Sequence, residues 1–401
     1  MAADLPARGD LALVLTGGGA RGAYQAGVLR GLARRIPGLR FPIIAGVSAG
    51  AINASFLAAH PGTFAEATEE LCGIWHRLQA EDIFRVDPIS LARQFSHWAA
   101  RLASGGMGLP EVRGLVDTRP LHDTIQHSTV TVDGELVGIQ RNLERGTLQA
   151  LALTALNYST EQTVTWVQAR DFEPWSQPRH RVVHARITAD HVMASAALPL
   201  FFPAVRLGDQ WYGDGGIRLS TPLAPALRLG ATRILAISPH HEPTEEEASR
   251  PKSRGYPPPA QILSQLMDAI FLDILDEDVR RLQSINRLVD RLPPAAQSRM
   301  RKVEIRSIRP SQGLGKLATA YEPKLPAGFR YLTRSLGTKE TDTSDFLSFL
   351  MFQPNYLQHL LEIGEADAEA RLAAVRSLLE APPSKDYEEP CEEAEEIAGL
   401  S

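Results

Sequence analysis

Ser48 stands in a sequence pattern that is typical of a catalytic nucleophile. Together with Gly46 and Gly50 it forms the motif G-x-S-x-G, with an apolar run over 43–47 before it and small residues over 49–59 after it. A sharp turn from strand to helix presents such a serine at the carboxyl edge of a sheet, where the dipole of the helix N-terminus stabilises negative charge. The pattern indicates acyl transfer through a serine, a reaction that passes through a tetrahedral oxyanion.

Three consecutive glycines form a second candidate for chemistry. Gly17, Gly18 and Gly19 follow an apolar run over 11–16 and precede a helix expected over 21–35. Backbone N–H groups at such a turn can point toward one place, and each donor of an oxyanion hole contributes on the order of 3 kcal/mol to transition-state stabilisation. We therefore expect the glycine loop to receive the oxyanion that attack by the serine creates.

The same loop allows a different interpretation, because Gly17, Gly19 and Gly22 match the G-x-G-x-x-G of dinucleotide-binding folds. Those folds need an acidic residue about 20 positions further on to hold the ribose hydroxyl. No Asp or Glu occurs from Leu11 to Ala65. A nucleotide-binding oxidoreductase, which a titration with NAD(P)H would test, is therefore the less favoured interpretation.

Asp214 is the candidate base for the serine. It lies in the segment YGDGGI, between Gly213 and Gly215, where the glycines predict a tight, exposed turn after a short strand. A plain β-turn without chemistry would have the same pattern. A Ser-His-Asp triad also stays open, with His240 or His241 as the base, since both follow Asp214 in the order found in α/β-hydrolases.

The three motifs together resemble the patatin-like phospholipase family. G-G-G-x-R-G over 17–22, G-x-S-x-G over 46–50 and D-G-G over 214–216 stand in the order seen in that family. The segment SAALPLFFPAV over 195–205 is similar to the family's S-x-x-x-P-x-x-F-x-P block. The resemblance covers roughly residues 11 to 240 and is specific because the motifs occur as a set.

The resemblance implies a Ser–Asp dyad without histidine, in which Ser48 is the nucleophile and Asp214 the general base. It assigns the oxyanion hole to Gly17, Gly18, Gly19 and Arg21, with Gly22, Gly46, Gly50, Gly215 and Gly216 as supporting motif positions. Because a carboxylate is a weak base for a hydroxyl group, burial must raise its basicity. The implied substrate is an ester of a glycerophospholipid or neutral lipid, cleaved through an acyl-enzyme without a metal or organic cofactor.

The elements that must position these residues indicate an α/β fold. Apolar runs alternate with helical patterns, which favours a mostly parallel sheet covered by helices on both faces. We expect a three-layer α/β/α catalytic domain over 9–310, which includes a helical cap over 64–120, a mobile loop over 239–259 and one amphipathic helix over 260–289. A helical C-terminal extension over 311–381 and an acidic, disordered tail over 382–401 are expected to follow.

Composition narrows the classes of partner and compartment. The net charge of -5 argues against a nucleic-acid partner. Cys72 and Cys391 lie far apart, so no disulfide framework is expected, and neither a signal peptide nor a metal-ligand motif is recognisable. We expect a cytoplasmic protein that touches a membrane surface peripherally. In the cap, Trp98 with Leu102, Met107 and Leu109 could form a lipid-facing lid or part of the core.

We therefore expect a serine lipid acyl hydrolase of the phospholipase A or lysophospholipase type. An acyltransferase remains an alternative, because an alcohol can replace water in attacking the same acyl-enzyme. A regulatory protein with the same fold and little turnover is a second alternative, against which the intact Ser48, Asp214 and glycines argue.

Overall fold

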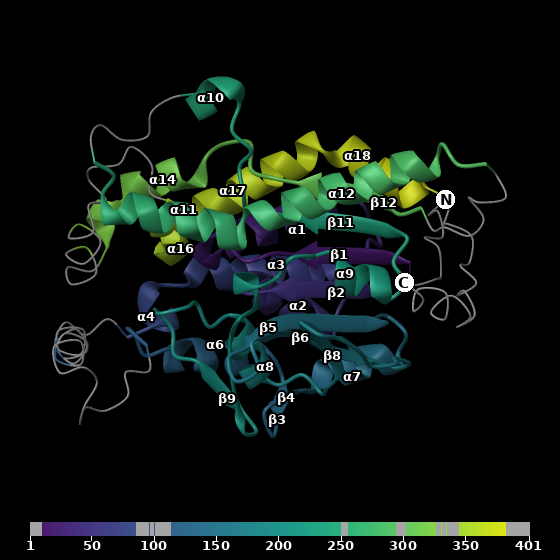
Figure 1. The fold of residues 1–401 in the computed structure, drawn as a ribbon, viewed down its shortest axis with the longest axis horizontal. Coiled ribbons are helices and arrows are strands. Elements are labelled where there is room, and N and C mark those ends of the chain that lie inside the picture. Colours follow the sequence, from purple (N-terminus) through teal and green to yellow (C-terminus); the bar gives the residue numbers. More distant parts are fainter. Residues whose placement is uncertain are drawn as a thin grey trace, which may run out of the picture.

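A β-sheet forms the centre of the protein in the computed structural model, which describes residues 10–85, 114–249, 256–293, 302–325 and 345–381 together with Ser96, Ala100, Arg330 and Arg334. Within that part of the chain, five parallel strands lie side by side (Figure 1): β12 (Glu304–Ile308), β11 (Arg233–Ile237), β1 (Leu11–Leu15), β2 (Ile43–Val47) and β5 (Ala150–Asn157). All residues of β1, β2, β5 and β11 are buried, as expected for a sheet covered on both faces.

Beyond β5 the sheet becomes mixed. β6 (Gln162–Ala169) runs antiparallel to β5 along its whole length, and β8 (His180–His184) and β7 (Trp175–Gln177) continue that side. Two strands share the opposite edge of β5, because β2 pairs with its first part and β10 (Gln210–Asp214) pairs antiparallel with its last residues. β9 (Val205–Leu207) pairs with β10, and β3 (Thr131–Val132) pairs with β4 (Glu135–Leu136).

Alternating side chains of the central strands face two helical layers. Leu13 and Leu15 of β1 face one layer, whereas Ala12 and Val14 face the other, since successive side chains of a strand point to opposite faces. The first layer contains α1 (Gly22–Arg35), α2 (Ala49–Ala59), α3 (Phe64–Arg77), α7 (Val137–Glu144), α17 (Pro354–Ala370) and α18 (Leu372–Glu380). The second contains α9 (Ala224–Arg228) and α12 (Asp273–Val289). The predicted three-layer α/β/α architecture is confirmed.

Short helices surround the ends of the central strands. They are η1 (Gly19–Arg21), α4 (Ala80–Ile83), α6 (Arg119–Ser128), α8 (Ala189–Ser195), η2 (Gly215–Ile217), α14 (Leu314–Tyr321), η3 (Glu322–Lys324) and α16 (Asp345–Leu350), with the longer α11 (Pro259–Phe271). η1 follows β1, and η2 follows β10 directly. Because α16 packs on η1 and α11 packs on η2, both helices lie at the carboxyl ends of these strands.

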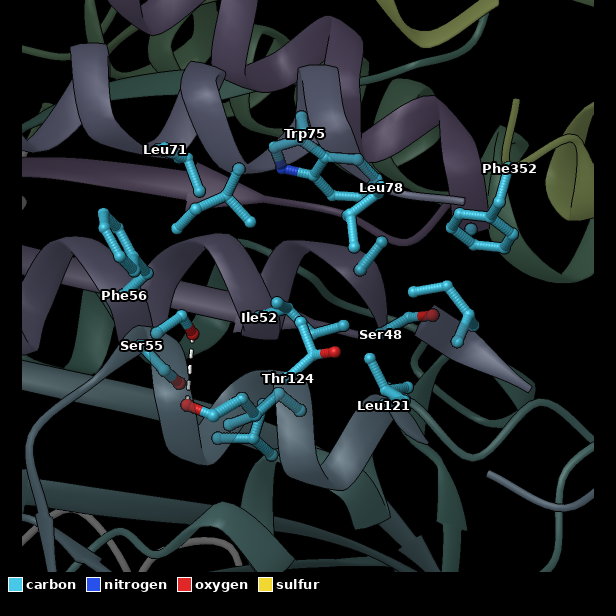
Figure 2. Close-up of a pocket in the computed structure, with 18 of the residues that line it drawn as sticks. Ser48, Ile52, Ser55, Phe56, Leu71, Trp75, Leu78, Leu121, Thr124 and Phe352 are labelled. Atoms are coloured by element: carbon cyan, nitrogen blue, oxygen red, sulfur yellow. Dashed lines mark hydrogen bonds between the residues drawn. The ribbon is translucent and has the colours of Figure 1, made fainter. Parts of the chain in front are cut away.

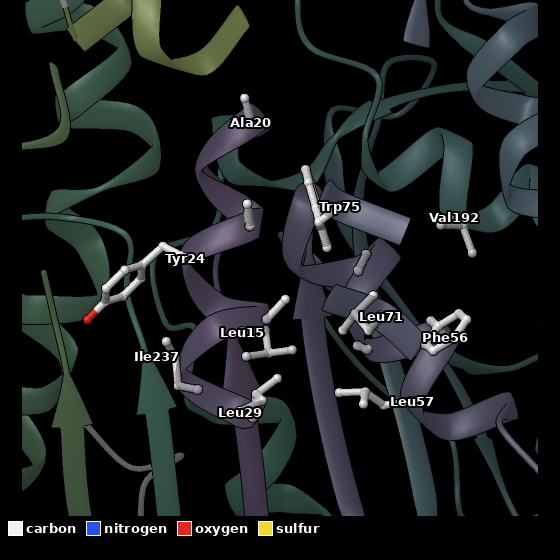
Figure 3. Close-up of a cluster of buried hydrophobic side chains, with 14 of the residues drawn as sticks. Leu15, Ala20, Tyr24, Leu29, Phe56, Leu57, Leu71, Trp75, Val192 and Ile237 are labelled. Carbon is white, nitrogen blue, oxygen red and sulfur yellow. The ribbon is translucent and has the colours of Figure 1, made fainter. Parts of the chain in front are cut away.

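The core between the sheet and the first helical layer holds the site's supporting helices in place (Figure 3). Leu15 and Ile237 come from the strands, Leu29 from α1 and Trp75 from α3, and all are almost fully buried. Burial of one large apolar side chain stabilises the fold by about 1.5–3 kcal/mol. This packed core therefore fixes α1 and α2, and with them their N-termini, against the sheet.

The single helix expected over 260–289 is two helices, so that prediction is wrong. α11 and α12 meet at a break at Leu272. Met267 and Phe271 of α11 pack into the core of the first layer, whereas Leu275 of α12 packs against the other face of the sheet. The break therefore lets one stretch of chain bury apolar side chains on both faces.

The expected peripheral segments fall partly within the described residues. α14, α16, α17 and α18 lie in the expected helical extension, and α17 packs along α1 and α3 of the first layer. The loop expected over 239–259 contains a short helix, α10 (Glu245–Ser249). The suggested lid residues Trp98, Leu102, Met107 and Leu109, and the tail over 382–401, lie outside the described residues.

Candidate active site

Ser48 occupies a strained turn between β2 and α2. Its backbone has φ 57° and ψ −130°, in the region of positive φ that residues other than glycine rarely adopt. The glycines of the motif make this turn possible. A Cβ atom on Gly46 would lie 2.6 Å from the carbonyl oxygen of Gly50, and one on Gly50 would overlap the carbonyl oxygen of Leu15. The predicted strand–turn–helix at Ser48 is present.

Ser195, at the end of α8, fixes the backbone of Ser48. The N–H of Ser48 donates a hydrogen bond of 3.1 Å to the Ser195 hydroxyl oxygen, and the Ser195 hydroxyl donates one of 2.6 Å to the carbonyl of Thr154 on β5. Ser195 is fully buried. Sequence reasoning singled out the segment that begins at Ser195 but assigned this serine no role, because a link across 147 residues leaves no local pattern.

Asp214 reaches Ser48 through the shared edge of β5. Val47, the last residue of β2, pairs with Thr154, while Asp214, the last residue of β10, pairs with the adjacent Ala155. The two strands run toward each other along one edge of β5, so they end head to head. A parallel strand and an antiparallel strand thus bring Ser48 and Asp214 together although they are far apart in the sequence.

The carboxyl group of Asp214 is fully buried, so the expected exposed turn is wrong in this respect. Oδ1 accepts a hydrogen bond of 2.9 Å from the N–H of Gly216, and Oδ2 has no hydrogen-bond partner within the described structure. Burial raises the pKa of Asp214 to about 7, and interactions with the Ser48 hydroxyl and the Gly216 N–H offset only part of that rise. Asp214 can therefore exchange a proton near neutral pH.

The glycine loop packs directly against the serine. A Cβ atom on Gly17 would lie 2.9 Å from the Cβ of Ser48, and one on Gly18 would lie 2.6 Å from the ring of Pro239. Gly19 has φ 56° and leaves no room for a side chain beside the carbonyl of Phe349. No described residue accepts a hydrogen bond from the N–H of Gly17 or Gly18. The glycine loop that packs against Ser48 therefore has backbone N–H groups that, within the described part of the chain, are free to donate a hydrogen bond to a bound molecule.

Ser48 opens onto an apolar pocket (Figure 2). Ile52 and Phe56 of α2 line it on one side, Trp75 of α3 lies above them in the view, and Leu121 of α6 lies below. Along α2 the distance from Ser48 to Phe56 is about 12 Å at 1.5 Å per residue. The pocket can therefore hold a hydrocarbon chain that extends away from the serine.

Comparison with known families identifies this chain. The profile of the family described as patatin-like phospholipase matches residues 13–227, which is more than half of the sequence and includes all three motifs. The chain belongs to the patatin-like phospholipase family. Comparison with curated proteins finds no match.

Three solved structures similar to this patatin-like chain are those of VipD, a human cytosolic phospholipase A2 and a type III effector protein. The match with VipD from Legionella pneumophila has 13% sequence identity and a TM-score of 0.31. It covers 88% of this chain and 67% of the VipD chain. The match with human GIVD cytosolic phospholipase A2 has 12% sequence identity and a TM-score of 0.43, and it covers 92% of this chain and 59% of the phospholipase chain. The match with the type III effector protein ExoU has 14% sequence identity and a TM-score of 0.34, and it covers 91% of this chain and 53% of the ExoU chain. The chain thus spans little more than half the length of the latter two.

Arg21 follows the glycine loop of this patatin-like protein and is almost fully buried. Its Nε donates a hydrogen bond of 2.6 Å to the Ser348 hydroxyl, and its guanidinium forms an ion pair with Asp345. The guanidinium also lies 5.0 Å from the centre of the Phe349 ring. Its backbone N–H donates to the carbonyl of Gly18 at 3.1 Å. The guanidinium and the backbone N–H of Arg21 therefore both have hydrogen-bond or ion-pair partners within the protein.

The histidines considered for a triad have other carboxylate partners. His240 Nδ1 lies 3.4 Å from Asp276, and His241 Nε2 lies 3.2 Å from Glu247. Neither ring hydrogen-bonds to Ser48 or Asp214 in the described structure. The geometry therefore argues against a Ser-His-Asp triad through either histidine.

The described residues of this patatin-like protein contain no cluster of three or more His, Cys, Asp or Glu side chains arranged to hold a metal ion. None of their helices is both long and apolar enough to cross a membrane.

Proposed function

We propose that this protein is a serine lipid acyl hydrolase that works through an acyl-enzyme on Ser48, of the phospholipase A or lysophospholipase type. The observation that carries the proposal is the buried Asp214 carboxyl, which has an unpaired Oδ2 and interacts with the hydroxyl of the strained Ser48 at the end of an apolar pocket. Membership of the patatin-like phospholipase family supports lipid esters as substrates.

In the proposed mechanism, Asp214 removes the proton from the Ser48 hydroxyl as its oxygen attacks the ester carbonyl. The pKa of about 7 suits a general base and acid near neutral pH, since proton transfer is most effective when the pKa lies close to the working pH. Collapse of the tetrahedral intermediate breaks the ester C–O bond, and the leaving alcohol takes the proton from Asp214. Water, deprotonated by Asp214, then attacks the acyl carbon. The bond between the acyl carbon and Ser48 Oγ breaks, Ser48 takes the proton from Asp214, and the fatty acid leaves.

The negative charge of the tetrahedral intermediate is assigned to the glycine loop. Gly17 packs against Ser48 and Gly19 lines the same pocket, so we assign this role to the N–H groups of Gly17, Gly18 and Gly19. The dipole of α2 adds to their stabilisation of the charge. Arg21 serves the oxyanion hole by holding the loop rather than by donating, because its guanidinium contacts Asp345 and Ser348. Gly22, whose Cβ would lie 2.7 Å from Trp75, keeps α1 close to α3.

Contact with a lipid surface is assigned to α11. Ile262 and Leu266, one helical turn apart, are 46% and 52% exposed. The same helix ends at Phe271, and the Phe271 ring fills the space where Gly216 lacks a side chain. α11 therefore runs from an exposed apolar face, which a lipid surface can contact, to the neighbourhood of the dyad.

The first experiment measures fatty acid release from mixed phospholipid vesicles and covalent labelling by a fluorophosphonate, in the wild type and in Ser48→Ala and Asp214→Asn. We expect release by the wild type and loss of release in both variants, with labelling absent in Ser48→Ala. Release that survives in Ser48→Ala would show that another residue is the nucleophile. Addition of a competing alcohol identifies an acyltransferase if an ester replaces the free acid among the products.

A further inference from the structure

The segment from Asp345 to Phe352 contacts both functional parts of the site. It lies more than a hundred positions beyond the family match, which ends at residue 227. Phe349, Leu350 and Phe352 line the pocket that opens at Ser48. The Phe352 ring stacks on Trp75 at 6.5 Å between ring centres, with an angle of 12°. One wall of the pocket therefore comes from the C-terminal part of the chain.

The same segment also contacts the glycine loop and the Arg21 side chain that follows it. Asp345 pairs with the guanidinium of Arg21, and Ser348 accepts a hydrogen bond of 2.6 Å from Arg21 Nε. The Ser348 hydroxyl in turn donates to the carbonyl of Asp345 at 2.5 Å. The carbonyl of Phe349 lies where Gly19 would carry its Cβ, so loop and segment touch backbone to backbone.

Neighbouring elements hold α16 firmly in this position. The N–H of Phe346 donates a hydrogen bond of 3.0 Å to the hydroxyl of Ser264 on α11. The Asp345 carboxylate also packs against Gly315, where a side chain would displace it. A buried ion pair that loses one partner leaves an uncompensated charge, which is strongly unfavourable. Arg21 therefore has a single well-determined position as long as α16 is in place.

We infer that Asp345 and Ser348 are positioning residues of the active site, which hold the Gly17–Gly19 loop in the shape that receives the oxyanion by fixing Arg21. The inference rests on the proposed function. Its physical basis is that oxyanion donors act only when they are preorganised, and a displacement of about 1 Å can cost a hundredfold in rate.

The test compares Asp345→Asn and Ser348→Ala with the control variant Glu365→Gln. Glu365 pairs with Arg30 at 2.5 Å and so also connects α1 with the C-terminal helices, but it does not touch the loop. For hydrolysis of a water-soluble ester we expect kcat to fall between about tenfold and a hundredfold in Asp345→Asn, with KM changed less than threefold or so. Glu365→Gln should keep the wild-type kcat.

Hydrogen exchange provides a readout that does not depend on activity. We expect the peptide that contains Gly17–Gly22 to exchange faster in Asp345→Asn than in the wild type, and to be unchanged in Glu365→Gln. Asp345→Glu, which keeps the charge, should restore part of both kcat and protection. If Asp345→Asn does not fold, Ser348→Ala, which removes two hydrogen bonds but no charge, provides the same comparison.

The outcomes separate this inference from the proposed function. Wild-type kcat and loop exchange in Asp345→Asn and Ser348→Ala would overturn the inference and leave the function standing. A wild type that neither hydrolyses esters nor reacts with a fluorophosphonate at Ser48 would overturn the function, and the exchange rates would then decide alone whether α16 holds the loop. An equal loss of kcat in Glu365→Gln would indicate general destabilisation and reject the positioning role.

Discussion

A methyl group on Gly17 would lie 2.9 Å from the Cβ of Ser48 and 3.3 Å from its hydroxyl oxygen. The backbone of the loop thus touches the serine, and any side chain at Gly17 must displace one of them. We expect Gly17→Ala to lower ester turnover about a hundredfold, while the free energy of unfolding falls by only about 1–3 kcal/mol. Kinetics and denaturant unfolding of the same variant measure both quantities.

Gly73→Ala is the matched control for that substitution. Gly73 lies inside α3, and its Cβ would meet only the Arg77 guanidinium at 3.5 Å. Alanine in a helix is more stable than glycine by about 0.5–1 kcal/mol, so this variant should be slightly more stable and fully active. Wild-type turnover in Gly17→Ala would contradict the close approach of loop and serine.

Turnover should rise with pH through the pKa of Asp214, about 7. As a general base the carboxyl acts in its ionised form, so activity on a soluble ester should be low at pH 5 and level off above pH 8 or so. Asp214→Asn should retain no such dependence in its residual activity. A rate that falls between pH 6 and pH 8 would be incompatible with Asp214 as the base.

The same carboxyl links stability to pH. Its folded pKa of about 7 exceeds the ordinary value of 3.8, so between these values the folded protein keeps a proton that the unfolded chain has released. The free energy of unfolding therefore falls as the pH rises from about 4 to 7, by at most about 4 kcal/mol from this group. Asp214→Asn removes this loss, since the amide oxygen can still accept from Gly216.

Denaturant unfolding at several pH values tests this prediction. The stability of Asp214→Asn relative to the wild type should grow from pH 4 to pH 8. A constant difference across that range would mean that Asp214 has an ordinary pKa in the folded protein.

Ser195→Ala should slow the reaction of Ser48 without unfolding the protein. The substitution removes the acceptor of the Ser48 N–H and the hydroxyl that donates to the carbonyl of Thr154. We expect fluorophosphonate labelling to slow by about tenfold to a hundredfold, and the free energy of unfolding to fall by about 1–3 kcal/mol.

The control for Ser195 is Thr232→Val. Thr232 is buried, and its hydroxyl donates 3.0 Å to Asp10 just before β11, at the end of the sheet opposite Ser48. Thr232→Val should lower the free energy of unfolding by a similar amount, while the rate of fluorophosphonate labelling stays that of the wild type. Equal labelling rates in both variants would remove Ser195 from the site.

The double variant Ile262→Glu, Leu266→Glu should weaken action on vesicles but not on a soluble ester. Two carboxylates on the exposed face of α11 oppose contact with a lipid surface, whereas the pocket at Ser48 is left as it is. We expect vesicle binding and vesicle hydrolysis to fall at least about tenfold, as co-sedimentation and fatty acid release would measure.

The corresponding control replaces Ile285 and Leu288 of α12, which are 47% and 62% exposed, by glutamate. If this pair weakens vesicle binding as much as the α11 pair does, the effect is one of net charge, and α11 is not the contact surface.

Short-range patterns in the sequence predicted the local parts of the site. The strand, turn and helix around Ser48 depend on residues within a few positions, and the alternating apolar runs predicted the parallel core. The approach of Asp214 was implied only by resemblance, because it depends on β10 pairing antiparallel with the end of β5. The turn glycines predicted an exposed Asp214, whereas the chemistry of a carboxylate base required a buried one, and the side chain is fully buried.

Interactions across the whole chain could not be predicted from a single sequence. Nothing near Arg21 indicates that its partners are Asp345 and Ser348, and nothing near Ser48 indicates Ser195. The break at Leu272 likewise arises because α11 and α12 pack on different faces of the sheet, which the uninterrupted helical pattern of that segment does not reveal.

Arg21 and Asp345 are separated by 324 positions, which has a consequence for biosynthesis. At a synthesis rate of roughly 5–20 residues per second, tens of seconds pass between the emergence of the two residues from the ribosome. During that interval Ser48 already exists, but one wall of its pocket and the anchor of its glycine loop have not been made. A growing chain therefore holds its nucleophile in an incomplete site until the segment over 345–352 has been made.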